Sequence, residues 1–177
     1  TDPGTTFDDH LRRYVNETRA KGGIPVLFNS IVRRNFVQPK DTSILKDVRR
    51  TPGESEPPKE GTVLFDTHGA YLDSPRNVAK ELGVAFIDMN KITHDLVEGL
   101  GPVESKKLFM FVEPDQVPAF PKGREDNTHL NVYGARVIAE LAVEAIGKAA
   151  VKGINHPGHP GKILAEEQVP GIVIPVN

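Results

Sequence analysis

Two short runs of apolar residues most constrain the fold of this chain. Residues 24–28 read Ile-Pro-Val-Leu-Phe, and residues 84–87 read Val-Ala-Phe-Ile. Neither run alternates apolar with polar residues, which is typical of strands that are covered on both faces. Because each run follows a segment with helical spacing that ends at glycine, the pattern predicts parallel α/β units.

Four helices are predicted around these runs. The residues expected to cap or open them are, in chain order, Thr5 or Thr6, Ser74 with Pro75, Asn90, and a residue near Asn131. The first three are expected to end at Gly22-Gly23, at Gly83 and between Gly99 and Pro102. The last helix has the longest apolar stripe of the four, so it is the clearest element of the sequence.

Three stretches lack a regular pattern. Residues 30–75 are broken by prolines and glycines, with 62–65 as a candidate short strand, and both a surface insertion and a substrate-facing loop remain open. A proline-rich loop is expected to run from about 102 to 127. Residues 153–177 are rich in glycine and proline, with 172–174 as a candidate edge strand.

Composition excludes several classes of protein. Lys and Arg number 22 against 24 for Asp and Glu, and basic runs are short, so neither nucleic acid nor a membrane is an expected partner. The absence of cysteine rules out thiolate catalysis, disulfides and cysteine-ligated zinc. No apolar run could span a bilayer, and the first residues do not read as a signal peptide. The length of 177 residues suits one domain.

The tetrapeptide Asp126-Asn127-Thr128-His129 is the strongest candidate for chemistry. It is expected on the loop that precedes the last helix. In a tight turn, this spacing lets the carboxylate accept a hydrogen bond from one ring nitrogen and leaves the other nitrogen to act as a general base. Taken alone, the same spacing also fits a helix-entry aspartate beside an unrelated surface histidine.

Several dispersed motifs together resemble one family. They are Pro3–Phe7, Val26–Phe36, Asp66–Gly69, Ile87–Met89, Ser105–Phe109, and Asp126–Leu130 with Tyr133–Ala135. In type and order they resemble the C-terminal half of rhamnogalacturonan acetylesterase-like enzymes of the SGNH (GDSL) hydrolase superfamily. The resemblance implies that Asp126 and His129 are the aspartate and histidine of a catalytic triad.

The resemblance also implies a fold. SGNH domains have a flavodoxin-like three-layer α/β/α architecture with the first and third strands at the centre. The two apolar runs match the fourth and fifth strands, so residues 1–150 are expected to form the C-terminal half of the domain. Residues 151–177 are expected to be a tail.

The chain departs from the family where the nucleophile should be. It lacks the G-D-S motif and the two blocks that supply the oxyanion-hole glycine and asparagine. Its serines are Ser30, Ser43, Ser55, Ser74 and Ser105, of which the last two are expected to be helix caps or surface residues. We therefore expect a C-terminal fragment that needs an N-terminal segment of roughly a hundred residues to complete its core.

The main functional prediction is a secreted or periplasmic serine esterase that removes acetyl groups from a pectic polysaccharide or oligosaccharide. It would need no metal or organic cofactor, and the missing N-terminal segment would supply the nucleophile. The alternative is a non-catalytic carbohydrate-binding or assembly module on the same scaffold. A metal-dependent hydrolase that uses Asp126, His129 and the tail histidines ranks lower, because the ligand spacing does not suit a compact site.

The remaining candidate residues have weaker signals. His156 and His159 are expected in a solvated tail, and His10 and His94 on helix surfaces. Asp66 and His68 are expected to share a structural hydrogen bond. Arg33 and Arg34 follow a predicted strand, where open α/β sheets bind ligands, so contact with an acidic sugar is weighed equally against ion pairing or solvation. These four groups complete the set of candidate site residues.

Overall fold

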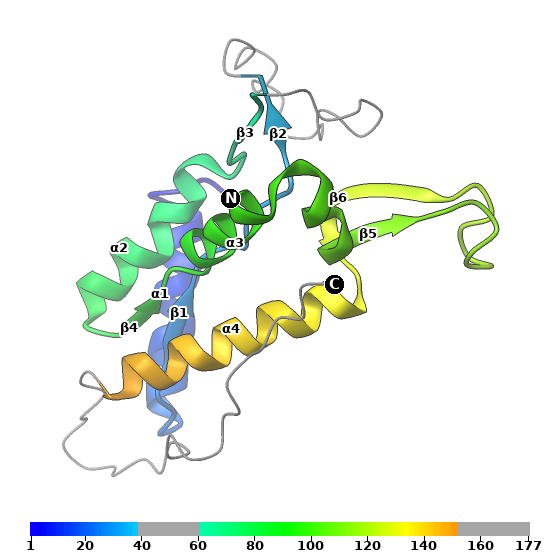
Figure 1. Ribbon diagram of the computed structural model, residues 1–177. Helices are drawn as coiled ribbons and strands as arrows, with labels where there is room; N and C mark the ends of the chain where they lie inside the picture. The colour runs from blue at the N-terminus through cyan, green and yellow to red at the C-terminus, as the bar shows by residue number, and fades with distance from the viewer. Residues whose placement is uncertain (39–60, 152–177) are drawn as a thin grey trace.

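The computed structural model describes residues 1–38 and 61–151 of the chain (Figure 1). The elements are α1 (Thr6–Ala20), β1 (Val26–Phe28), β2 (Phe36–Val37), β3 (Val63–Leu64), α2 (Asp73–Leu82), β4 (Ala85–Ile87), α3 (Met89–Glu104), β5 (Phe109–Val112), β6 (Arg124–Leu130) and α4 (Val132–Val151). Short 3-10 turns at Gly69–Leu72 and Ser105–Leu108 precede α2 and β5. Within the two described ranges, no helix is long and apolar enough to cross a membrane.

The two apolar runs form neighbouring parallel strands, as expected. β1 pairs with β4, with Leu27 opposite Phe86 and Phe28 opposite Ile87. Successive side chains of a strand point to opposite faces of the sheet. Leu27 and Phe86 therefore share one face, and Val26 and Ile87 share the other.

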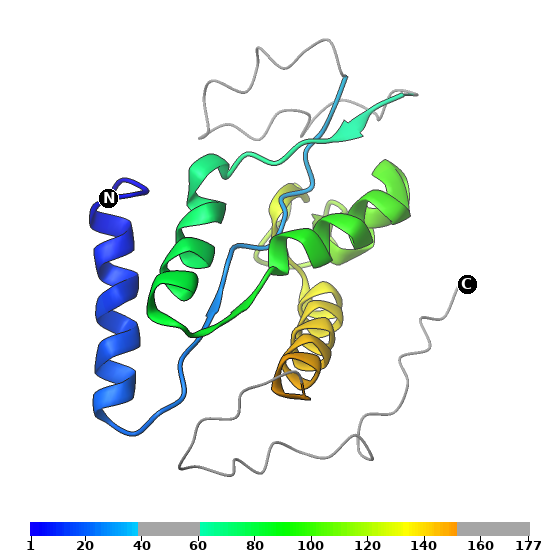
Figure 2. The same cartoon turned by 90° about the vertical axis from the view of Figure 1, so that its left-hand side faces the viewer.

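Helices cover both faces of this strand pair. On one face, Leu27 and Phe86 pack with Val15 of α1 and Val78 of α2. On the other face, Val26 and Ile87 pack with Ile138 and neighbouring residues of α4. This is the three-layer α/β/α order that the resemblance implies, with α1 and α2 side by side in one outer layer (Figure 2).

A third cluster lies beyond the strand pair, under α3. Val32, which follows β1, packs with Leu64 of β3, Val97 of α3, and Leu108 and Phe109 at the start of β5. β2 and β3 pair antiparallel, so the expected short strand at 62–65 is confirmed. This cluster joins the segment after β1 to the elements that carry Asp126 and His129.

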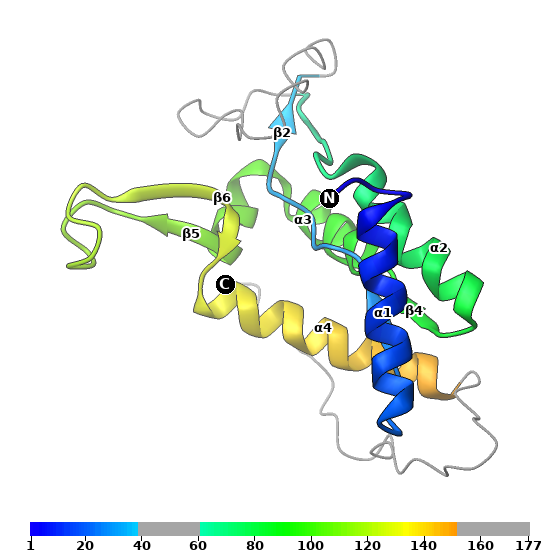
Figure 3. The same cartoon turned by 180° about the vertical axis from the view of Figure 1, so that it is seen from behind.

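The expected proline-rich loop contains a hairpin instead. β5 and β6 pair antiparallel, and the hairpin projects from the body of the molecule (Figures 1 and 3). The pairing shifts between Phe109, opposite Leu130, and Met110, opposite Asp126, so residues 127–129 bulge out of the ladder. The prolines that suggested a loop fall at 114, 118 and 121, in the connection between the two strands.

Three helix boundaries differ from the sequence prediction. Asp88, not Asn90, caps α3 by accepting a hydrogen bond from the amide of Lys91 at 3.0 Å. α3 continues to Glu104, although Gly101 has a non-helical φ of 70° and marks a break inside it. α2 begins at Asp73, so Ser74 lies inside its first turn, buried, rather than at the cap.

The start of α4 is fixed against the turn that precedes β5. The side chain of Asn131 accepts a hydrogen bond from the amide of Gly134 at 2.8 Å and donates to the carbonyls of Lys107 and Phe109. A Cβ atom on Gly134 would lie 1.9 Å from the carbonyl oxygen of Leu108. Only glycine allows this close approach of helix and turn.

Gly134→Ala should destabilise the protein by about 3 kcal/mol or more, because the added methyl group meets backbone atoms that cannot move aside. Gly147→Ala is the matched control on the same helix, since no atom lies within 4 Å of its Cβ position. The control should stabilise the protein by up to about 1 kcal/mol through helix propensity. Urea unfolding measures both changes, and equal effects at the two positions would contradict this account.

Candidate active site

Asp126 and His129 form a hydrogen-bonded pair on β6. Nδ1 of His129 lies 2.8 Å from Oδ2 of Asp126. The carboxylate is buried, whereas the imidazole side chain is 67% exposed. The pair therefore has the contact that its spacing predicts, but on a bulged strand rather than on a loop.

Local backbone geometry aims the histidine at the carboxylate. Oδ1 of Asp126 accepts hydrogen bonds from the amides of Thr128 at 2.8 Å and His129 at 2.9 Å. Aspartate side chains commonly fold back on amides two and three residues ahead in this way. The bulge at 127–129 is thus stabilised by the same carboxylate that receives the imidazole.

Asp126 is held in its ionised form. Burial alone would raise the pKa of the Asp126 carboxyl, but donors surround it: the amides of His129 and Thr128, the guanidinium of Arg124 and the imidazole. Together these donors hold the pKa well below its usual value. An ionised Asp126 favours a proton on Nδ1 of His129, which leaves Nε2 as an acceptor that can serve as a general base.

Arg34 anchors the pair to the rest of the molecule. Its amide donates to the carbonyl of Asn127 at 2.8 Å, and its guanidinium donates to the Asn127 side chain, to Ser105 Oγ at 2.9 Å and to the carbonyl of Pro102. The guanidinium also lies against the rings of Phe36 and Phe111, with Cζ 5.6 and 5.1 Å from their centres. Burial lowers the pKa of Arg34 to about 10.

Arg34 is therefore a buried structural residue. The expectations of a sugar contact or of solvation are wrong for this arginine, because its polar atoms point at protein acceptors. Arg33 faces a different segment and donates to Thr67 Oγ1 at 3.1 Å. The sequence pattern does not show that these two arginines have different environments, because they are adjacent and of the same residue type.

A second polar cluster lies where β1 and β4 end. Asn29 follows β1 and donates to Asp88, which follows β4, at 2.8 Å. The backbone amide of Asn90 donates to Oδ1 of Asn29 at 2.9 Å, and the side-chain amide of Asn90 donates to Asp66 at 2.6 Å. Asp66 also lies 3.1 Å from Nδ1 of His68, so the expected hydrogen bond of that pair is present.

The sequence also predicts that the Asp126–His129 pair lies beside the carboxyl ends of the strands that contain Phe28 and Ile87, where open α/β sheets bind ligands, and this position stays a prediction. Leu130, the last residue of β6, packs in the cluster that contains Ile87 of β4. The residues that directly follow β1 and β4, however, are those of the second polar cluster.

The serines of the described ranges do not contact His129. Ser105 is fully buried and bonded to Arg34, and Ser74 is buried and bonded to Asp8. The surface alternative is wrong for both serines, because each is buried against a charged side chain. Ser105 does occupy the C-cap position of α3, as the cap prediction allows, whereas Ser74 lies inside α2. Ser30 is exposed after β1, while Ser43 and Ser55 lie outside the described residues.

The remaining candidates are placed as follows. His10 is exposed on α1, and His94 is half-buried on α3, 3.7 Å from Glu98. His156, His159 and the candidate edge strand at 172–174 lie outside the described residues, as does the expected tail apart from Val151. Across residues 1–38 and 61–151, no three metal-binding side chains come together.

Sequence reasoning missed the roles of two residues around the site: Arg124, which binds Asp126, and Asn127, which binds Arg34. Arg124 and Asp126 stand two apart, so a predicted strand would have placed them on one face. The prolines nearby favoured a loop and concealed that signal.

Comparison with known proteins supports the resemblance. The rhamnogalacturonan acetylesterase RhgT of Bacillus subtilis (strain 168) is 35% identical to the chain over 156 residues. The matched region is 88% of this chain and 58% of that protein, so the chain spans a little over half the length of its relative. No protein-family model matches the chain, and no solved structure does.

Arg34→Met should destabilise the protein by about 2–4 kcal/mol, because it leaves Asn127 Oδ1 and Ser105 Oγ buried without their donor. Arg13→Met is the control, since Arg13 makes an exposed ion pair with Glu17 at 2.6 Å. The control should change the free energy of unfolding by less than about 1 kcal/mol. Similar losses in urea unfolding for both variants would contradict the anchoring role.

The free energy of unfolding should fall as the pH drops below about 4. The pKa of Asp126 is lower in the folded than in the unfolded state, so its stabilising contribution is present above the unfolded value and is lost on acidification. Asp126→Asn should reduce this loss in urea unfolding between pH 6 and pH 3. The control Asp95→Asn removes an exposed carboxylate of α3. An unchanged acid dependence in Asp126→Asn would contradict the assignment.

Proposed function

We propose, from the relationship to a rhamnogalacturonan acetylesterase, that this chain is part of an SGNH-type serine esterase that deacetylates a pectic polysaccharide. Its contribution is the histidine and aspartate of the triad. The observation that carries the proposal is the 2.8 Å contact between Nδ1 of His129 and a carboxylate, Asp126, that its surroundings keep ionised. A polymeric pectic substrate implies a secreted or periplasmic enzyme.

The chemistry assigned to His129 has four proton transfers, two in acylation and two in deacylation. Nε2 takes the proton of a serine hydroxyl while Oγ attacks the acetyl carbonyl carbon, and Asp126 stabilises the imidazolium that forms. The imidazolium then gives the proton to the departing sugar oxygen as the ester bond breaks. Water, deprotonated by the same nitrogen, next attacks the acetyl carbon of the acetyl-serine. The imidazolium then returns the proton to Oγ as the bond to Oγ breaks and acetate leaves.

The serine and the oxyanion donors are assigned to a segment N-terminal to the region described here. Three observations support this. The chain contains no G-D-S motif, it matches 58% of its relative, and in the described residues β1 pairs with β4 alone, which leaves its second edge available to another strand. Phe28 of β1 remains 37% exposed beside that edge.

In the protein expressed with its N-terminal segment, His129→Ala should lower kcat for an aryl acetate by about 10²–10⁴-fold. Asp126→Asn should leave a larger residual rate, because the base itself remains. His10→Ala, on the exposed face of α1, is the control and should keep wild-type activity. The chain without that segment should show no hydrolysis that depends on His129.

Labelling with a fluorophosphonate, followed by peptide mapping, locates the nucleophile. The label is expected on a serine of the N-terminal segment. A label on Ser30, Ser43, Ser55, Ser74 or Ser105 would overturn the assignment of the nucleophile to that segment. Activity that survives His129→Ala would overturn the triad, and binding of acetylated oligosaccharides without turnover would favour the carbohydrate-binding alternative.

A further inference from the structure

Arg124 contacts the same carboxylate oxygen as His129. Its Nη2 lies 2.5 Å and its Nε 3.1 Å from Oδ2 of Asp126, the oxygen that also lies 2.8 Å from Nδ1 of His129. Oδ1 is occupied by two backbone amides. Both oxygens of the carboxylate are therefore held, and among the described residues Arg124 is the only side chain besides His129 that donates to it.

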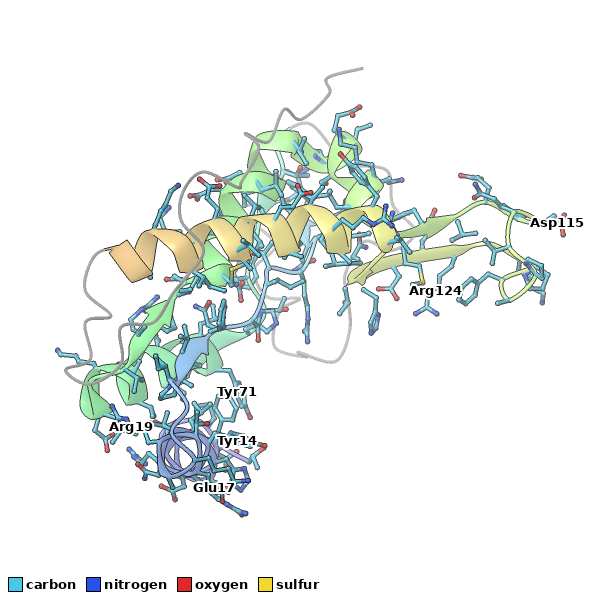
Figure 4. The ribbon with its side chains drawn as sticks, turned by 90° about the horizontal axis from the view of Figure 1, so that it is seen from below. Tyr14, Glu17, Arg19, Tyr71, Asp115 and Arg124 are labelled. Atoms are coloured by element: carbon cyan, nitrogen blue, oxygen red, sulfur yellow. The ribbon has the colours of Figure 1, made fainter. Side chains whose placement is uncertain are left out.

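The strand and a nearby ring place the guanidinium. Arg124 and Asp126 are two residues apart on β6, so their side chains leave the same face of the strand. Cζ of Arg124 lies 5.1 Å from the centre of the Phe120 ring, which comes from the connection of the hairpin. Figure 4 shows Arg124 on the hairpin, nearer the body than Asp115 at the tip.

This arrangement limits how the carboxylate can turn. The two backbone amides hold Oδ1, and because both oxygens turn together about the bond between Cβ and Cγ, a donor on Oδ2 adds a second restraint on that rotation. The guanidinium supplies this donor, and its two N–H groups on one oxygen restrain Oδ2 more than a single donor would. A consequence is that Arg124 and His129 compete for the same acceptor, Oδ2 of Asp126.

The second histidine–aspartate pair of the molecule offers a comparison. Asp66 lies 3.1 Å from Nδ1 of His68, and its other oxygen receives the neutral amide of Asn90. That imidazole side chain is only 14% exposed. The pair on β6 thus differs in having a shorter contact, an exposed imidazole and a cation on the shared oxygen.

We propose that Arg124 is a positioning residue for the Asp126–His129 pair: it fixes Oδ2 of Asp126 so that His129 keeps its Nδ1 proton on Asp126 and presents Nε2 as the base. The inference rests on the proposed function. The competing account is that the ion pair only stabilises the hairpin, as many partly exposed pairs do weakly.

The test uses the protein expressed with its N-terminal segment. Arg124→Met should lower kcat for an aryl acetate about tenfold or more while KM changes less than about twofold, because the guanidinium acts on the base and not on substrate binding. Arg124→Lys keeps one cationic donor and should recover a large part of the loss. Arg13→Met, which removes an exposed arginine of a carboxylate pair on α1, should leave both constants unchanged.

An NMR measurement of the tautomer of the His129 ring tests the same positioning effect without measuring turnover. Correlation of the ¹⁵N and ¹H signals of the His129 ring should show one tautomer, with the proton on Nδ1, in the wild-type protein and in Arg124→Lys. Arg124→Met should show a mixture of the two tautomers at neutral pH. The urea midpoint of Arg124→Met should match that of Arg13→Met, which separates positioning from stability.

The outcomes separate this inference from the proposed function. Loss of activity in His129→Ala, together with an unchanged kcat and a single tautomer in Arg124→Met, would overturn the role of Arg124 alone. Activity that survives His129→Ala would overturn the proposed function. A tautomer mixture in Arg124→Met would then still support the positioning of His129 by Arg124.

Discussion

The buried guanidinium of Arg34 determines where the candidate site lies. A charged group inside a protein is costly unless its N–H groups have acceptors, and those of Arg34 bond to Asn127, Ser105 and the carbonyl of Pro102. These acceptors come from β6, from the turn before β5 and from α3, while Arg34 itself follows β1. Satisfying this one group therefore brings three distant segments together, and Asn127 is the neighbour of Asp126. The position of the Asp126–His129 pair therefore depends on a residue that contacts neither member of the pair through its side chain.

The fold could be predicted from the sequence wherever the burial of a segment requires a simple pattern of apolar residues. The continuous apolar runs at 24–28 and 84–87 mark strands covered on both faces, and both strands are present and parallel. Gly83 adopts the left-handed conformation that ends α2, as a helix-terminal glycine should. The Asp126–His129 contact also followed from spacing, because donor and acceptor are three residues apart and little else is needed to bring them together.

The rest depended on contacts that spacing does not encode. Nothing in the pair Arg33-Arg34 shows that the second arginine is buried between two rings, since the partners lie about 70 and 90 residues away. From the sequence, Ser105 is expected to be a helix cap or a surface residue, and its bond to the buried Arg34 cannot be foreseen. The hairpin escaped prediction because its prolines are concentrated in the connection, and the bulge at 127–129 interrupts the alternation by which a strand is recognised.

The carboxylate of Asp126 and the groups of the described residues that donate to it all lie within residues 124–129. Closing such a short span costs little chain entropy. The geometry of the pair is thus a property of a six-residue segment and its hairpin partner, and the rest of the fold sets only what that segment faces. Such a segment is a suitable unit for grafting onto an unrelated antiparallel hairpin, where it would carry its own orienting groups with it.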